Sequence, residues 1–191
     1  MDLSKCHWLN KSRLTTKSII LYGVFAFYLM LMVNILLLKS INPAEIFSPS
    51  REYHRVIELV PFNQIFGYLS GELNVSPTTV IYNVFGNIAI FVPLGIYLAL
   101  FRKDKRLSVN MLLVFLTSLS VEVIQFAFGL GISDIDDIIL NCLGGFIGLL
   151  IYKGLARLLK SEEQTRTAVT VFSGIVGLPI IVITVLLFVY N

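Results

Sequence analysis

The sequence predicts an all-α integral membrane protein, a bundle of five transmembrane helices. Of its 191 residues, 56% are hydrophobic and 14% are charged, with a mean hydropathy of +0.82. A soluble domain carries about 25% charged residues. Five apolar runs are each long enough to cross the hydrocarbon core of a bilayer, and the basic residues fall on alternate sides of these runs. We therefore expect a multi-pass protein of the cell membrane.

The five apolar runs define the expected spans, with ends set to within a few residues. The first run follows four basic residues, as a signal peptide would, but it is too long for one and no A-x-A cleavage site follows it. It is therefore predicted to remain as the first helix of a single polytopic domain over residues 1–191. The spans are Ser18–Leu38, Val80–Phe101, Asn110–Phe128, Asp137–Leu159 and Ala168–Tyr190.

The basic residues predict the orientation of the chain. Four lie in the N-terminal tail, four in the loop Arg102–Asn110 and four in the segment Lys153–Arg166. The loop Gly129–Asp136 has none. Since Lys and Arg in short loops tend to stay in the cytoplasm, we expect the N-terminus inside and the C-terminus outside.

The first external loop, Lys39–Thr79, is expected to contain a short amphipathic segment. Pro61 could occupy the first position of a helix, where its missing N–H costs nothing. Two interpretations stay open: the segment lies in the outer headgroup region, or it packs on the bundle. Its apolar face would consist of Phe62, Ile65, Phe66 and Leu69.

Polar side chains gather near the expected outer ends of the second, third and fourth spans. At 1.5 Å per residue, those of the third span lie about 5–9 Å below its outer end. If the three helices pack together, these groups would enclose an acidic pocket that opens outward. The residues are Asn83 and Asn87 in the second span, Glu122 and Gln125 in the third, and Asp134, Asp136, Asp137 and Asn141 at the start of the fourth.

Structural roles explain part of this set. Ser133 or Asp134 could cap the fourth helix, and acids in its first turn would favour the helix dipole. The asparagines could form hydrogen bonds between helices. The GxxxG spacing of Gly144 and Gly148 predicts close helix packing, and Pro93 predicts a bend in the second span.

Glu122 is the strongest functional candidate. Capping cannot explain it, because it lies inside a helix, and a carboxylate in the hydrocarbon costs about 3 kcal/mol. It could bind a ligand or act as a general acid or base, which makes it the candidate catalytic residue.

Other site classes receive little support from the sequence. His7 and His54 would lie on opposite sides of the membrane, so no histidine metal site is expected, and a Glu/Asp/Asn oxygen cage for a divalent cation is a weak alternative. No HExxH or P-loop motif appears, and no cofactor is predicted. The basic clusters lack the interleaved aromatics of a nucleic-acid site.

Four segments, taken in order, resemble the VanZ-like (teicoplanin-resistance) family of membrane proteins over about residues 58–150. They are 59-LVPF-62, 83-NVFGNIAIFVPLG-95, the E-x-x-Q pair Glu122/Gln125, and 134-DIDDIILNCLGGFIG-148. Two features depart from the family: Glu58 stands where many relatives have Asn, and no Arg precedes the Asp run. The resemblance assigns recurrent polar positions to Asn83, Asn87, Glu122, Gln125, Asp134, Asp137 and Asn141, and small or bending positions to Gly86, Pro93, Gly95, Gly144 and Gly148.

The resemblance implies a function in the cell envelope, since the type member lowers susceptibility to the lipoglycopeptide teicoplanin. One hypothesis is a non-enzymatic protein that binds a lipid-linked envelope precursor or a lipidated molecule in the outer leaflet, with membrane lipids as its other partners. The alternative is a membrane-embedded enzyme that uses Glu122 with Asp134 or Asp137 on a lipid-linked substrate. The sequence leaves open whether the protein is an enzyme.

Overall fold

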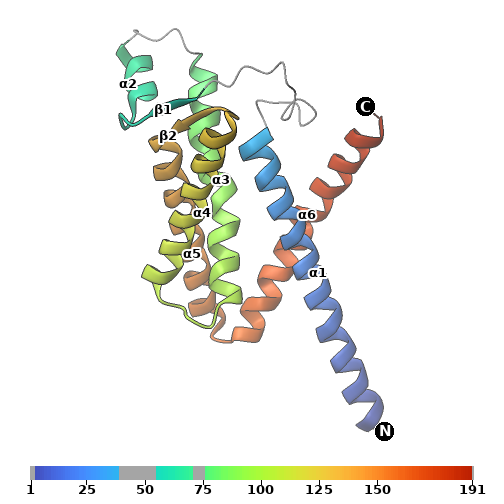
Figure 1. The fold of residues 1–191 in the computed structure, drawn as a ribbon. Coiled ribbons are helices and arrows are strands. Elements are labelled where there is room, and N and C mark those ends of the chain that lie inside the picture. The colour runs from blue at the N-terminus through green and yellow to red at the C-terminus, as the bar shows by residue number, and fades with distance from the viewer. Residues whose placement is uncertain (1–2, 39–54, 71–75, 191) are drawn as a thin grey trace. The chain divides into compact units, whose positions relative to one another are not determined.

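A computed structural model of the chain describes residues 3–38, 55–70 and 76–190 (Figure 1). Among these residues, five helices are long and apolar enough to cross a membrane, as predicted. Much of the loop Lys39–Thr79, including His54, lies outside the described residues. In chain order the elements are α1 (Leu3–Leu38), β1 (Val56–Glu58), α2 (Asn63–Ser70), α3 (Pro77–Phe101), α4 (Leu107–Phe128), β2 (Ile132–Asp134), α5 (Ile135–Leu159) and α6 (Glu162–Tyr190).

The spanning helices begin earlier than the apolar runs do. Helix α6 starts at Glu162, although its apolar run starts at Ala168. Ser161 precedes the helix, and its Oγ accepts a hydrogen bond from the Gln164 N–H at 3.4 Å. Acidic residues fill the first turn, where they favour the helix dipole. The first turn is therefore helical because it is capped, and hydropathy does not detect it.

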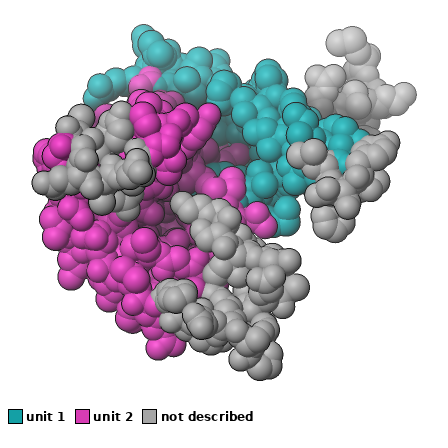
Figure 2. All heavy atoms as spheres, turned by 90° about the horizontal axis from the view of Figure 1, so that it is seen from above, with its two compact units in different colours: residues 1–32, 155–191 teal, residues 33–154 magenta. Residues whose placement is uncertain are grey.

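The chain divides into two compact units, coloured in Figure 2. Unit 1 comprises residues 1–32 and 155–191, and unit 2 comprises residues 33–154. Within unit 1, the Arg166 guanidinium donates to the Ser18 Oγ at 3.5 Å, and Gly177 of α6 packs against the Val24 side chain of α1. The family-like region, about residues 58–150, lies entirely in unit 2 with all the predicted polar residues.

Glycines bring α3 and α5 into backbone contact within unit 2. A Cβ atom on Gly144 would collide with the Ile88 carbonyl oxygen, and one on Gly148 would collide with the Val92 carbonyl oxygen. On the α3 side of the interface, a Cβ atom on Gly95 would collide with the Gly145 carbonyl oxygen of α5. This is the close packing that GxxxG spacing provides between helices in a bilayer.

Gly86 and Pro93 of α3, which the resemblance also assigned as small or bending positions, differ from these glycines. Gly86 is exposed, and a Cβ atom there would meet nothing within 4 Å, so the packing role expected for it is wrong. The position lies on the side of α3 that faces away from α5. Pro93 is half-buried inside α3, and the helix continues beyond it to Phe101.

Residues of α3, α4 and α5 meet in layers at four-residue steps. Gly145 of α5 packs on the Val114 side chain of α4, and one turn away Asn141 is hydrogen-bonded to Ser118. Helices α4 and α5 run in opposite directions (Figure 1). Continuing this register by four residues on each helix therefore pairs Glu122 with Asp137. Successive layers are about 6 Å apart. We name them the carboxylate layer (Glu122, Asp137), the amide layer (Asn87, Ser118, Asn141) and the apolar layer (Phe91, Val114, Gly145). The Asn87 amide also reaches Asp137 of the first layer.

The opposite end of unit 2 is closed by the basic loop between α3 and α4. The Lys105 Nζ donates to the carbonyl oxygens of Ala99 at 2.6 Å and Leu100 at 3.3 Å. It also lies 5.3 Å from the centroid of the Tyr152 ring on α5. A cation at this position satisfies carbonyl groups that the end of α3 leaves unpaired, and it interacts favourably with the helix dipole.

The glycine contacts predict a position-specific effect of adding one methyl group. Gly144→Ala and Gly148→Ala should each destabilise the protein by about 1–3 kcal/mol, because the new Cβ meets a backbone carbonyl that cannot move away cheaply. Gly86→Ala, in the same helix pair but facing open space, should be neutral or stabilising by up to about 1 kcal/mol. Thermal unfolding in detergent would measure this. Equal effects at all three positions would contradict the observed packing.

Candidate functional site

A short parallel sheet covers the end of unit 2 where the polar residues lie. Strands β1 and β2 pair with Val56 opposite Ile132, Ile57 opposite Ser133 and Glu58 opposite Asp134. The pairing holds the chain before α3 against the connection between α4 and α5. We refer to residues 55–70, which contain β1 and α2, as the cap segment.

A tight turn connects β1 to α2 and differs from the sequence prediction. Helix α2 starts at Asn63, so Pro61 is not at the first helical position, and that prediction is wrong. Instead the Asn63 N–H donates to the Val60 carbonyl oxygen at 3.3 Å, and Phe62 has φ of 61°. A type II turn favours Pro at its second position and requires positive φ at its third. A right-handed helix excludes that φ, so α2 can begin only after Phe62.

Three carboxylates each accept a backbone N–H in sequence. The Phe62 N–H donates to the Asp136 carboxylate at 2.6 Å. The Asp136 N–H donates to the Asp134 Oδ1, and the Asp134 N–H donates to the Glu122 Oε2, both at 2.9 Å. Asp134 therefore caps α5, as one of the two predicted capping residues. The carboxylates also connect the cap segment to α4 and α5.

The remaining polar residues form separate contacts. The Asn87 Nδ2 donates to the Asp137 Oδ1, which joins α3 to α5. The Asn141 Nδ2 donates to the Ser118 Oγ at 3.0 Å, which joins α5 to α4. Asn83 is half-buried, one turn before Asn87 on α3.

Gln125 lies apart from the carboxylates, although it was predicted in the same site. Its Nε2 donates to the Leu36 carbonyl oxygen of α1 at 2.9 Å, and its Oε1 has no hydrogen-bond partner. Gln125 thus holds the end of α1 against α4 within unit 2. Gln125 lies one turn from Glu122 on nearly the same face of α4, but its amide reaches toward α1 and not toward the carboxylates.

The carboxylates are buried, whereas the sequence predicted a pocket that opens outward. Exposed fractions are 3% for Glu122, 4% for Asp134 and Asp136, and 9% for Asp137. The cap segment closes over them through Phe62, with Glu58 opposite Asp134. Helix depths alone could not predict this cover, because it comes from a loop segment that pairs with residues more than 70 positions away.

Sequence analysis placed Asp136 among the residues of the expected acidic pocket without naming a partner for it, and it assigned no site role to Phe62. Asp136 was read as a first-turn acid, and Phe62 as part of an apolar helix face. In the structure their hydrogen bond is the contact between the cap segment and α5. The one sequence signal for it was 59-LVPF-62, a segment outside the spans that resembles the family.

Burial raises the pKa of Asp134, which lies just before α5 and outside the spans. The N–H of Asp136 works against this shift, whereas the nearby carboxylates of Asp136 and Glu58 add to it. A carboxyl with a raised pKa in the folded state favours folding most when it is protonated. Its contribution to stability is therefore present below its ordinary pKa and lost as the pH rises through the raised value.

Among the described residues, no three His, Cys, Asp or Glu side chains converge as ligands of a metal ion would. The side chains that do meet between α3, α4 and α5 combine carboxylates with amides and a hydroxyl. The oxygen atoms of this set can accept hydrogen bonds from N–H or O–H groups.

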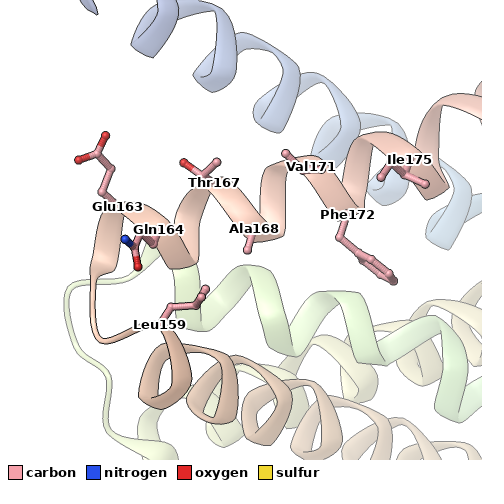
Figure 3. A pocket seen from close by; sticks show the side chains of 8 residues that line it. All are labelled: Leu159, Glu163, Gln164, Thr167, Ala168, Val171, Phe172 and Ile175. Atoms are coloured by element: carbon pink, nitrogen blue, oxygen red, sulfur yellow. The ribbon is translucent and has the colours of Figure 1, made fainter.

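A hollow of about 720 Å³ lies elsewhere, along one face of α6 in unit 1 (Figure 3). Apolar side chains such as Val171, Phe172 and Ile175 line it, with Glu163 and Gln164 at one end. None of the predicted site residues contributes to it. Because α6 is a candidate span, an apolar face of this kind is surface that lipid covers.

The raised pKa of Asp134 predicts how the stability of one variant depends on pH. Asp134→Asn keeps an oxygen that can cap α5 but removes the buried negative charge. Its unfolding temperature should therefore exceed that of the wild type at pH 7, and the difference should shrink as the pH falls toward 4. Asp134→Ala, which also removes the cap, should cost about 0.5–2 kcal/mol. A difference between Asn and Asp that does not vary with pH would contradict this account.

Comparison with known proteins identifies the family. The VanZ/LLP1 family matches residues 25–159, which include both strands, α2 to α5 and every predicted site residue. Protein VanZ of Enterococcus faecium is 33% identical over 122 residues, which are 62% of this chain and 74% of that protein. No solved structure matches. With its five candidate spans, the chain is a multi-pass membrane protein, and it belongs to the VanZ/LLP1 family.

Proposed function

We propose that this protein binds a lipid-linked or lipidated molecule in the outer leaflet, and that it thereby lowers susceptibility to teicoplanin-type lipoglycopeptides. The observation that carries the proposal is a set of buried carboxylates directly beneath a cap segment that carries exposed apolar side chains. Exposed fractions there run from 47% to 68%, at Val56, Ile57, Leu59, Val60 and Phe66. A molecule with an acyl chain and a polar head group matches both features.

Charge supports an orientation with this end outside. The carboxylates of the β2–α5 region lie at one end of unit 2, and the loop with Arg102, Lys103, Lys105 and Arg106 lies at the other. Basic loops tend to stay in the cytoplasm. The N-terminus would then be inside, the C-terminus outside, and the cap segment at the level of the outer head groups.

The cap segment suggests how a head group would reach the carboxylates. The Phe62 N–H donates to the Asp136 carboxylate. Once the segment moves outward, a ligand N–H or O–H could donate to that carboxylate instead. The left-handed backbone of Phe62 costs about 1–2 kcal/mol, and moving the segment would release that strain. Carboxylates beneath would then hold the head group, while the apolar side chains of the segment contact the acyl chain.

The test is antibiotic susceptibility in a susceptible Gram-positive host that expresses wild type, Glu122→Gln or Asp137→Asn at matched membrane levels. Wild type should raise the inhibitory concentration of teicoplanin more than that of vancomycin, because only teicoplanin carries a fatty-acyl chain. With either variant, the inhibitory concentration of teicoplanin should fall back toward that of the host without the protein. Glu163→Gln, which alters an exposed acid of α6, is the matched control and should protect like the wild type.

Each other outcome has a distinct meaning. Equal protection by wild type and both variants would show that the carboxylates serve packing alone. Equal protection against vancomycin would exclude recognition of the acyl chain. If the wild type does not protect, the effect on teicoplanin does not extend to this chain. Turnover of a lipid-linked precursor by purified wild type, abolished in Glu122→Gln, would instead favour the enzymatic alternative.

A further inference from the structure

Three buried side-chain oxygens in the described part of unit 2 lack a donor, those of Asn110, Gln125 and Asn141, and only Asn141 lies one turn from the buried carboxylates. The Asn141 side chain is 1% exposed, and its Nδ2 bonds to Ser118, but its Oδ1 has no hydrogen-bond partner. A buried amide oxygen without a partner costs about 1–3 kcal/mol. Such an atom in a native structure indicates a ligand, an ion or a water that satisfies it.

Negative charge lies one turn from this oxygen. The carboxylates of Glu122 on α4 and Asp137 on α5 occupy the neighbouring layer, since Glu122 accepts the Asp134 N–H and lies four residues from Ser118, the partner of Asn141. They are 3% and 9% exposed. Two carboxylates that share a low-dielectric site favour a positive charge between them.

The groups around this pair add to the negative charge. Asp134 on β2, Asp136 in the first turn of α5 and Glu58 on β1 all lie on the cap side. The one basic residue of the cap segment, Arg55, donates to the Ala127 carbonyl oxygen at 3.3 Å. On the other side lie the neutral amides and hydroxyl of the amide layer.

We propose that unit 2 binds a single monovalent cation between the carboxylate layer and the amide layer, held by Glu122, Asp137 and the Asn141 Oδ1. Oxygen ligands from carboxylates and amides suit a hard cation such as Na⁺. A proton held between the two carboxylates would supply the same charge. The shared chemistry is one positive charge bound by oxygens, and the experiment separates the two sources. This inference does not rest on the proposed binding of a lipidated molecule.

The apolar layer makes this a binding site and not a pathway. Phe91 and Val114 are 0% exposed, and Val114 packs directly on Gly145, one turn beyond Asn141. No polar side chain of α3, α4 or α5 lies in that layer. A cation that entered from the cap side would therefore stop at the amide layer, where it would tie the three helices together.

The test is the thermal unfolding of the full chain, purified in detergent, as a function of sodium. NaCl replaces choline chloride at pH 8 and constant ionic strength, which keeps screening unchanged. Binding to the folded state should raise the unfolding temperature with saturation, by about 3–5 °C at ten times the half-saturating concentration. A second arm without sodium lowers the pH from 8 to 5.

Variants assign the effect to the site. Asn141→Leu and Glu122→Gln should abolish the dependence on the cation. Asn110→Leu is the matched control, because the Asn110 Oδ1 is also buried without a partner, but at the opposite end of unit 2. It should lower the unfolding temperature, since Asn110 bonds the carbonyl oxygens of Asp104 and Arg106, yet keep the full response.

The outcomes separate clearly. A sodium response lost only in Asn141→Leu and Glu122→Gln identifies an alkali cation. A response to pH alone that is smaller in both site variants than in the wild type and in Asn110→Leu identifies a proton, because all of these chains retain the pH dependence of Asp134. No sodium response together with the same pH response in all chains overturns the proposal, and so does a sodium response that both site variants retain in full. If Asn141→Leu does not fold, the near-isosteric Glu122→Gln decides the question alone.

Discussion

The structure of unit 2 depends on backbone contact between α3 and α5 at Gly95, Gly144 and Gly148. In a bilayer no hydrophobic effect draws helices together, because lipid tails are as apolar as the side chains they would replace. Close approach of the two backbones supplies the van der Waals contact instead, and carbonyl groups across the interface leave no room for a Cβ atom. That contact fixes the register of the two helices, and the register determines which polar side chains meet.

The polar residues serve structure and chemistry together. Asn87 joins α3 to α5 through Asp137, and Glu122 joins α4 to the start of α5 through the Asp134 N–H. Polar contacts of this kind specify one arrangement among several that apolar packing would tolerate. The same groups leave carboxylates and an unsatisfied amide oxygen in the interior, where interactions are strong because water is excluded.

Hydropathy and charge predicted the spans, since apolar runs are local properties that need no knowledge of tertiary contacts. Equal depth below the membrane surface placed Glu122 near Asp134 and Asn87 near Asp137. It could not show which neighbouring helix a side chain reaches, so Gln125, which bonds to α1, was grouped with them. The cover over the carboxylates escaped prediction for another reason. It depends on strand pairing between distant segments and on the positive φ of Phe62, an uncommon conformation for that residue type.

The pairing of β1 with β2 has a consequence for biosynthesis. The partners Val56 and Ile132 are more than 70 positions apart in the sequence, and the spanning helices α3 and α4 lie between them. A chain grows from its N-terminus at about 5–20 residues per second, so β1 is complete several seconds before its partner strand exists. The strand pair can close only after α3, α4 and β2 have been made, and β1, with its exposed apolar side chains, must remain unpaired until then.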